Sequence, residues 1–419
     1  MATPARRRPR AALRRAVAAA GLVLAAAGCG REVDSASPAP ARAGLEPAYG
    51  DTLVEAVLGN VSSLIPNLTS DVASHEVGDL LYDALITLDR DLNPVPSLAE
   101  AWTFSSDCRE LRLRLRRDVR WHDGQPFTAA DVIFTYRATV DPRVPSPYKA
   151  DFAEVEGVEA VDDHTVVVRF RRPFARALTV AASHPILPRH LLEPYVRDGK
   201  IREAPQNWVR PVGTGAYRFK ELTAGEKIVV VANPDYFGGR PYIARRVFRV
   251  IPSQATQFLE LKAQAVDLMG LTALQYARQT SYPAFRKAYE KYRYPDRVYT
   301  YFGFNLRDPR FADRRVRQAF AHAIDKRALI EGVRLGLGRE ATGPYQPGTW
   351  AYTDRVRTYP HDLARARALL AEAGWRERNA DGLLVKDGRP FTFEVLTNQG
   401  NDERKKVAEI VQAALRELG

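Results

Sequence analysis

The sequence predicts a mixed α/β (α+β) protein with more than one domain. Two hydrophobic patterns alternate along it: a period of two, typical of half-buried strands, and a spacing of three to four residues, typical of helix faces. The length of 419 residues allows two or three domains of roughly 100 to 200 residues each. A composition with 45% hydrophobic and 27% charged residues is that of a globular protein and excludes disordered, collagen-like and coiled-coil chains.

Strand and helix patterns begin soon after the N-terminal region. Residues 52–58 predict a strand, and residues 77–88 carry apolar side chains at the spacing of a helix face. Residues 111–116 alternate Leu and Arg, which predicts a half-buried strand whose arginines face water. A phosphate-binding row of arginines is the alternative, and the solvated strand face is favoured.

The middle of the chain continues this alternation. Thr128 and Asp131 have the spacing of a capping box and predict a helix that starts there. Residues 158–170 predict a hairpin, residues 247–251 a strand and residues 254–265 a helix. Strands and helices are therefore expected to mix throughout this region.

Three amphipathic helices are predicted in the last third of the chain. The first covers residues 313–332 and has Asp313 as its N-cap. The second covers residues 364–373 and ends at Gly374, a residue type that tolerates a positive φ. The third covers residues 404–418. Together with the strands, these helices support the mixed α/β assignment.

Residues 213–217 (GTGAY) are rich in glycine but lack the context of a phosphate loop. Such a loop needs the N-terminus of a helix directly after its glycines. Here residues 217–231 predict strand instead. The glycine pattern therefore does not indicate a nucleotide site.

The N-terminal region has the features of an export signal. Residues 1–28 contain six arginines and no acidic residue, and their apolar stretch is too short for a membrane span. Residues 26–29 resemble a bacterial lipobox, so we expect Cys29 to be lipidated and to anchor the protein to the membrane on the periplasmic side. A plain secretory signal with an incidental cysteine is the alternative. Residues 29–49 predict a flexible tether.

The net charge is less unusual once this signal is removed. The formal charge of +12 falls to +6, because residues 1–28 contribute six positive charges. The remaining basic residues are dispersed, and an exported protein rarely meets nucleic acid. We therefore expect no nucleic-acid partner.

No set of residues indicates a catalytic or metal site. The seven histidines are scattered singly, and the cysteines are only Cys29 and Cys108. His122 and Asp123 form the most enzyme-like pair, but adjacent residues on a strand or turn point to different sides. A structural role in a turn is favoured for them, with an exported hydrolase as the alternative. We expect a binding protein rather than an enzyme, without cofactor or metal.

Several ordered segments together carry a family resemblance. They are residues 97–102 (SLAEAW), 119–132 (VRWHDGQPFTAADV), 212–217 (VGTGAY), 233–241 (NPDYFGGRP), 302–305 (FGFN), 315–320 (RVRQAF), 323–325 (AID) and 368–375 (ALLAEAGW). In this order they closely resemble the extracellular solute-binding proteins of family 5, the oligopeptide-, dipeptide- and nickel-binding components of ABC importers. The resemblance covers residues 50–419 and departs at Cys108, where the family usually has glycine. Relatives continue past residue 419, so we expect a fragment or a truncated product.

The resemblance implies a two-lobed periplasmic-binding-protein clamp of the peptide-binding type with an extra inserted domain. Residues 50–75 and 187–285 would form the first lobe, residues 76–186 the inserted domain, and residues 286–419 an incomplete second lobe. Family members capture peptides or related solutes between the lobes and deliver them to an ABC permease in the membrane. We expect this protein to do so as a monomer; a peptide-binding sensor or chaperone is the alternative.

The resemblance also implies where a ligand would lie. In peptide-binding relatives an N-terminal edge segment holds the ligand as an added strand, and it aligns with Ser70, Asp71 and Val72. Asn305, near the start of the second lobe, is a further candidate for the cleft wall. An ordinary loop at residues 70–72 and a strand end at Asn305 are the alternatives.

Overall fold

The computed structural model describes residues 46–89, 93–294, 298–349 and 352–419. Every helix and strand in these ranges lies in one compact unit formed by Gly44–Lys291 and Asp296–Gly419. The expected signal peptide (residues 1–28), Cys29 and most of the tether lie outside the described residues. Within the described ranges, no helix combines the length and the apolar character needed to cross a bilayer.

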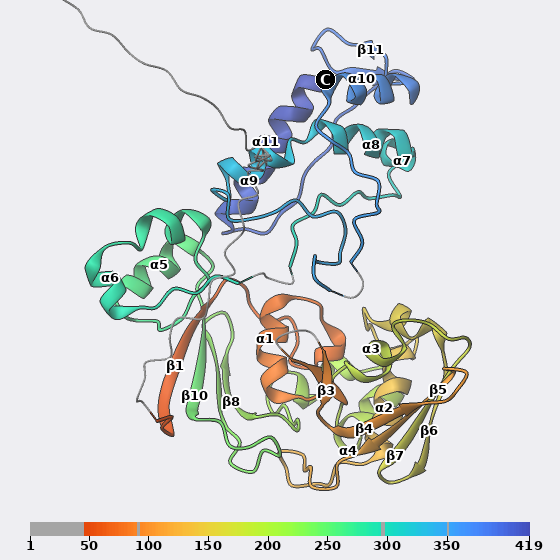
Figure 1. The fold of residues 1–419 in the computed structure, drawn as a ribbon, viewed down its shortest axis with the longest axis vertical. Coiled ribbons are helices and arrows are strands. Elements are labelled where there is room, and N and C mark those ends of the chain that lie inside the picture. Colours follow the sequence, from red (N-terminus) through yellow and green to blue (C-terminus); the bar gives the residue numbers. More distant parts are fainter. Residues whose placement is uncertain (1–45, 90–92, 295–297, 350–351) are drawn as a thin grey trace, which may run out of the picture. The chain divides into compact units, whose positions relative to one another are not determined.

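The first sheet combines the first strand of the described chain with three consecutive strands from much later in the sequence (Figure 1). They are β1 (Gly50–Val57), β8 (Tyr217–Thr223), β9 (Lys227–Ala232) and β10 (Ile243–Val250). Their order is β1-β10-β9-β8, with β1 parallel to β10 and the other pairs antiparallel. The strands predicted at residues 52–58 and 247–251 are confirmed. The parallel pairing places the beginning of the described chain beside a segment far along the sequence.

Helix α1 (Val72–Leu81) shares a hydrophobic core with this sheet. Val77 and Leu81 of the helix are buried together with Ile228 and Phe248 of the sheet. One face of the helix is therefore covered, as expected of an amphipathic surface helix.

Both predicted boundaries of the helix over residues 77–88 are wrong. The helix begins at Val72 and ends at Leu81, and residues further on form β2 (Ile86–Leu88), paired with β3 (Pro94–Pro96). The helical spacing was misleading because Leu85 is buried in a second hydrophobic core. Its apolar character therefore serves another contact and does not extend the helix.

The second sheet contains β4 (Ala99–Phe104), β5 (Glu110–Leu115), β6 (Val155–Asp162) and β7 (Thr165–Phe170). Its order is β4-β5-β7-β6, and all neighbouring strands are antiparallel. The hairpin predicted over residues 158–170 is confirmed. Helix α2 (Ala129–Val140) covers the sheet with Ala129 and Val132 in their common core.

The alternating strand has the predicted two faces. Leu111, Leu113 and Leu115 are 0% exposed, whereas the residues between them are exposed. Nε of Arg114 lies 2.6 Å from the Glu100 carboxylate on the neighbouring strand. The solvated strand face is therefore confirmed, because the arginine has an acidic partner in water.

Local capping sets the start of α2, and further helices follow the second sheet. The Asp131 carboxylate accepts the Thr128 backbone amide at 3.0 Å, as the capping-box spacing predicted. The later helices are α3 (Ala177–Ala182), α4 (Arg189–Arg197), α5 (Gln254–Lys262), a π-helical turn (Gln275–Gln279) and α6 (Pro283–Ala288). Phe258, Leu261 and Phe285 bury α5 and α6 against each other.

The C-terminal part is mainly helical. It contains α7 (Pro309–Ala312), α8 (Arg314–Ala323), α9 (Lys326–Gly332), α10 (Leu363–Glu372) and α11 (Asp402–Leu418), with the short strands β11 (Glu377–Arg378), β12 (Leu384–Lys386) and β13 (Arg389–Pro390). The helices predicted over residues 364–373 and 404–418 are confirmed. Gly374 has a φ of 95°, which explains why glycine follows α10.

The prediction of a single helix over residues 313–332 is wrong, because this region forms two separate helices, α8 and α9. Asp313 caps α8 as expected, accepting the Arg315 amide at 2.8 Å. Ile324 is extended, and Asp325 then caps α9 by accepting the Ala328 amide at 2.9 Å. A second capping residue inside an amphipathic run therefore ends one helix and begins another.

Candidate functional site

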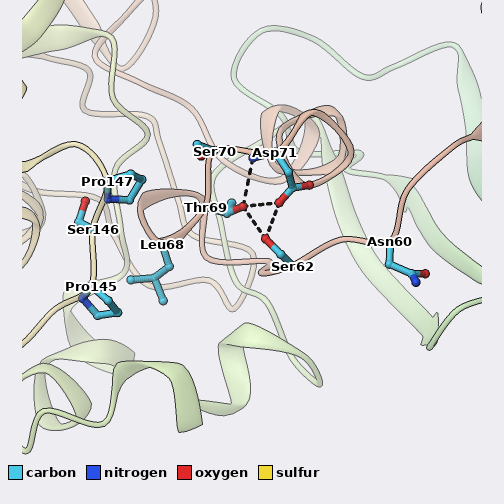
Figure 2. Close-up of a pocket in the computed structure, with 9 residues that line it drawn as sticks. All are labelled: Asn60, Ser62, Leu68, Thr69, Ser70, Asp71, Pro145, Ser146 and Pro147. Carbon is cyan, nitrogen blue, oxygen red and sulfur yellow. Dashed lines mark hydrogen bonds between the residues drawn. The ribbon is translucent and has the colours of Figure 1, made fainter. Parts of the chain in front are cut away.

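A surface cavity of about 620 Å³ lies between two short segments of the chain (Figure 2). Asn60, Ser62, Leu68, Thr69, Ser70 and Asp71 line one wall, and Pro145, Ser146 and Pro147 line the other. This volume is within the range of small-molecule and peptide-sized sites, roughly 300 to 1,000 Å³. The lining is dominated by hydroxyl groups and prolines, and Asp71 is its one charged residue.

The first wall is built by a sharp change of backbone conformation. Pro66 opens a 3₁₀ turn (Pro66–Leu68), since proline is well suited to the first helical position. Thr69 is then extended, with φ −138° and ψ 158°, and Asp71 is extended as well, with φ −82° and ψ 149°. Asp71 accepts the Ser74 amide at 2.8 Å and so caps α1. The sequence thus places a short extended segment between two helical turns.

The Asp71 carboxylate is saturated by hydrogen bonds. Its Oδ2 accepts the hydroxyls of Ser62 and Thr69 (Figure 2). It also accepts the hydroxyl of Ser74, at 2.8 Å. Partial burial opposes ionisation, but the hydrogen bonds from Ser62, Thr69 and Ser74 outweigh it and hold the pKa of Asp71 below its usual value. Asp71 is therefore ionised and engaged within the protein, which leaves it poorly placed to pair with a ligand cation.

Ser70 differs from both of its neighbours. It is exposed in the cavity wall, and among the described residues neither its backbone nor its hydroxyl has a hydrogen-bond partner. Because Thr69 and Asp71 are extended and held by their own bonds, Ser70 presents a fixed main chain with free N–H and C=O groups. Such groups can pair with another extended chain.

The second wall is tied to the first through Tyr148. The Tyr148 hydroxyl donates to the Thr69 carbonyl at 2.8 Å, and Nε2 of His75 lies 2.7 Å from the same hydroxyl. The ring of Tyr148 also lies 5.2 Å, centre to centre, from that of His184. Sequence reasoning missed His75 and Tyr148, because no local pattern connects residues so far apart in the chain.

The structure places two of the four predicted site residues in the cavity wall. Ser70 and Asp71 line the cavity, whereas Val72 is the first residue of α1, is 63% exposed and is not among the lining residues. Asn305 lies in a turn, where its side chain accepts the Arg307 amide at 3.1 Å and its carbonyl accepts the Asp308 amide at 3.0 Å. The structure does not bring Asn305 to this cavity.

The glycine-rich segment joins two parts of the fold. A Cβ atom on Gly213 would lie 1.8 Å from the Leu81 carbonyl oxygen, and one on Gly215 would lie 2.3 Å from that of Leu80. The Gly215 amide donates to the Leu81 carbonyl at 2.9 Å. These glycines therefore allow the close approach of α1, and the segment leads into β8, as the strand prediction required.

His122 and Asp123 face different partners. The His122 ring bonds to the backbone of Gly213 and Gly215, whereas Asp123 lies 2.7 Å from Nε2 of His190. The predicted divergence of the pair is confirmed. Within the described ranges, no group of three or more His, Cys, Asp or Glu residues is arranged to hold a metal ion.

Comparisons with known proteins agree with this architecture. Residues 93–419 match the family model of the bacterial extracellular solute-binding proteins, family 5 Middle. The chain is 31% identical over 407 residues to the oligopeptide-binding protein AppA of Bacillus subtilis, an alignment that covers 95% of this chain and 73% of the relative. It is 28% identical to the periplasmic oligopeptide-binding protein OppA of Escherichia coli, covering 94% of this chain and 73% of OppA.

Solved structures show the same similarity in three dimensions. The structure of AppA from B. subtilis in complex with a nonapeptide has a TM-score of 0.80 at 30% identity and covers 89% of this chain and 74% of that chain. NikZ from Campylobacter jejuni, in complex with Ni(L-His), has a TM-score of 0.72 at 26% identity. The match covers 88% of this chain and 72% of the NikZ chain. The predicted mixed α/β fold of the two-lobed peptide-binding type is confirmed by these similarities.

Proposed function

Because the chain belongs to the bacterial extracellular solute-binding proteins of family 5, we propose that it captures peptides outside the cytoplasmic membrane and delivers them to the permease of an ABC importer. The similarity to AppA, whose structure holds a nonapeptide, supports a peptide as the solute. The pair of His122 and Asp123 gives no support to a hydrolase, because the two side chains diverge. A binding protein without catalytic activity is therefore the proposed function.

The observation that carries this proposal is the free main chain of Ser70 in the cavity wall. A peptide that adds to an extended edge gains main-chain hydrogen bonds, which give affinity without reading its side chains. Asp71 fixes this edge without offering its charge to the ligand. Val72 follows this edge as the first residue of α1. We propose Val72 and Asn305 as further ligand contacts, the latter supplied by the second lobe.

The domain division predicted from the family is proposed here as well. The first lobe comprises residues 50–75 and 187–285, which the parallel pairing of β1 with β10 supports. The inserted domain covers residues 76–186 and the second lobe residues 286–419. The proposed boundary between residues 75 and 76 lies within α1 (Val72–Leu81), which therefore links the first lobe to the inserted domain.

Membrane attachment through Cys29 is also part of the proposal, with the protein acting as a monomer. Its support is the lipobox-like sequence at residues 26–29. Expression of the full chain with Cys29→Ala should move the protein from the membrane fraction to the soluble extracytoplasmic fraction. Retention of the variant in the membrane fraction would contradict lipidation at this cysteine.

The peptide function is tested by calorimetry with a nonapeptide of Ala, Gly and Ser, and with nickel–histidine as a second solute. Ser70→Pro removes the main-chain N–H and should weaken peptide binding about 5-fold or more, the effect of one net hydrogen bond. Thr69 already has the extended conformation that a residue before proline requires. Ser70→Ala is the matched control, because it keeps the N–H and removes only the hydroxyl. Binding of nickel–histidine without peptide would assign a different solute.

A further inference from the structure

We propose that His75 and Tyr148 are positioning residues that aim the Ser70 N–H at a bound peptide, an inference that rests on the proposed peptide-binding function. Neither residue needs to touch the ligand. Both act through the Thr69 carbonyl, which belongs to the same peptide group as the Ser70 N–H.

The direction of the hydrogen-bond chain follows from its donors. A tyrosine hydroxyl carries a single proton, and Tyr148 donates it to the Thr69 carbonyl at 2.8 Å. Nε2 of His75, at 2.7 Å from the hydroxyl oxygen, must therefore be the donor in that contact. The chain runs from His75 through Tyr148 to Thr69, and each link has one orientation.

The three residues come from separate elements, so the chain connects both walls of the cavity. His75 lies on α1, Thr69 ends the 3₁₀ turn at Pro66–Leu68, and Tyr148 precedes the 3₁₀ helix at Lys149–Glu154. The Tyr148 ring contacts the rings of both His75 and His184, with ring centres 6.3 Å and 5.2 Å away. Burial, reinforced by Asp151, raises the pKa of Tyr148, so its hydroxyl keeps the proton that it donates.

The geometry of the peptide group allows the hydrogen bond from Tyr148 to Thr69 to fix the direction of the Ser70 N–H. The Thr69 C=O and the Ser70 N–H lie in one plane and point in opposite directions, because the peptide bond is planar and trans. Fixing the oxygen on Tyr148 therefore fixes the N–H on the opposite side. The Thr69 hydroxyl adds a second tether, since it lies 2.6 Å from the Ser62 hydroxyl and also bonds to Asp71.

The first test measures peptide affinity in positioning variants. Tyr148→Phe removes the hydroxyl and should weaken binding of the Ala, Gly and Ser nonapeptide about 5-fold. His75→Phe should have a similar or smaller effect, and His75→Gln should restore affinity, because its amide nitrogen can donate in place of Nε2. Tyr217→Phe is the matched control, since Tyr217 donates to the Ile243 carbonyl at 3.0 Å and does not line the cavity.

The second test separates positioning from general stability with a double-mutant cycle. If Tyr148 acts through the Ser70 N–H, Tyr148→Phe should cause no further loss of peptide affinity in the Ser70→Pro background. If the fold-losses of peptide affinity in the two single variants instead multiplied in the double variant, Tyr148 would act elsewhere than through the Ser70 N–H. Wild-type binding that is unchanged by Tyr148→Phe would overturn the positioning role and leave the peptide function standing.

A third measurement needs no ligand. Backbone ¹⁵N relaxation of the ligand-free protein should show lower order at Ser70 in Tyr148→Phe than in wild type or Tyr217→Phe. Equal order in all three proteins would overturn the positioning role. Absence of peptide binding by the wild type, together with reduced order at Ser70, would refute the proposed solute but retain the anchoring contact.

Discussion

The backbone amide of Gly213 donates a hydrogen bond to Nδ1 of His122, with 3.2 Å between the two nitrogens. Nε2 of the same ring lies 3.0 Å from the Gly215 carbonyl oxygen, so the neutral imidazole carries its proton on Nε2. A second proton would have to reside on Nδ1, facing an N–H group. Burial, the main cause, lowers the pKa of His122 to about 4. The ring joins these segments only while it is neutral.

This contact predicts a loss of stability in mild acid. The folded pKa of about 4 lies below the ordinary value of 6.5, so the unfolded chain takes up a proton first as pH falls. The contribution of His122 is present above pH 6.5, declines between pH 6.5 and 4, and is lost below that range. By linkage, the full loss is about 3 kcal/mol of the free energy of unfolding.

Urea unfolding at several pH values from about 4 to 7 measures this effect. His122→Gln should flatten the decline relative to wild type, because the titrating ring is gone. The matched control is His322→Gln. It removes a histidine ring that bonds to the Pro360 carbonyl near the surface. Parallel profiles for wild type and His122→Gln would contradict the assignment.

Gly213→Ala should be strongly destabilising. Its Cβ would lie 1.8 Å from the Leu81 carbonyl oxygen, so either α1 or the glycine segment must move. We expect a loss of roughly 3 kcal/mol or more, at the upper end of overpacking effects. Gly157→Ala is the control, because in the described part of the chain no heavy atom beyond the residues adjacent to Gly157 lies within 4 Å of the added Cβ. Thermal unfolding of the two variants should differ clearly, and equal melting temperatures would refute the close approach.

Cys108→Gly should stabilise the protein slightly. Cys108 has a φ of 55° in the turn before β5, where its amide bonds to the Ser105 carbonyl at 2.9 Å. A side chain in this left-handed region is strained, and glycine relieves that strain, so the expected gain is about 0.5–1 kcal/mol. Cys108→Ala retains a Cβ and should give little gain in chemical denaturation. A similar gain in both variants would trace the effect to the thiol instead.

Asp71→Ala should cost more stability than removal of an ordinary helix cap. Asp325 caps α9 through one backbone amide, so Asp325→Ala is expected to cost about 1 kcal/mol. Asp71 accepts the Ser74 amide and three hydroxyls, and its loss should cost about 2–3 kcal/mol. Denaturation midpoints compare the two variants directly. Equal costs would show that the hydroxyl cluster adds nothing beyond capping.

The elements most accurately predicted are those whose signal is local. The alternation at residues 111–116 identified β5 because every second residue enters one core. The errors at residues 77–88 and 313–332 arose where apolar spacing continued through a change of partner. Leu85 belongs to another core, and Asp325 starts a new helix. Periodicity records that a side chain is buried but not what covers it.

Only some residues of the candidate site could be predicted from the sequence. Ser70 and Asp71 were identified through the family resemblance, and the structure places both in the cavity wall. Tyr148 and His75 carry no comparable signal, because the contact between them joins residues 73 positions apart. Their role depends on how two separate segments meet.

The sequence by itself determined the mixed α/β class, most strands and helices, and the family to which the chain belongs. These properties depend on local periodicity, capping residues and ordered motifs, which can be read along one dimension. Only the tertiary structure decided that Gly213 lies against Leu81, that His122 bonds to the glycine segment and that Tyr148 orients Thr69. Such contacts depend on distances between segments far apart in the chain, and no local pattern encodes those distances.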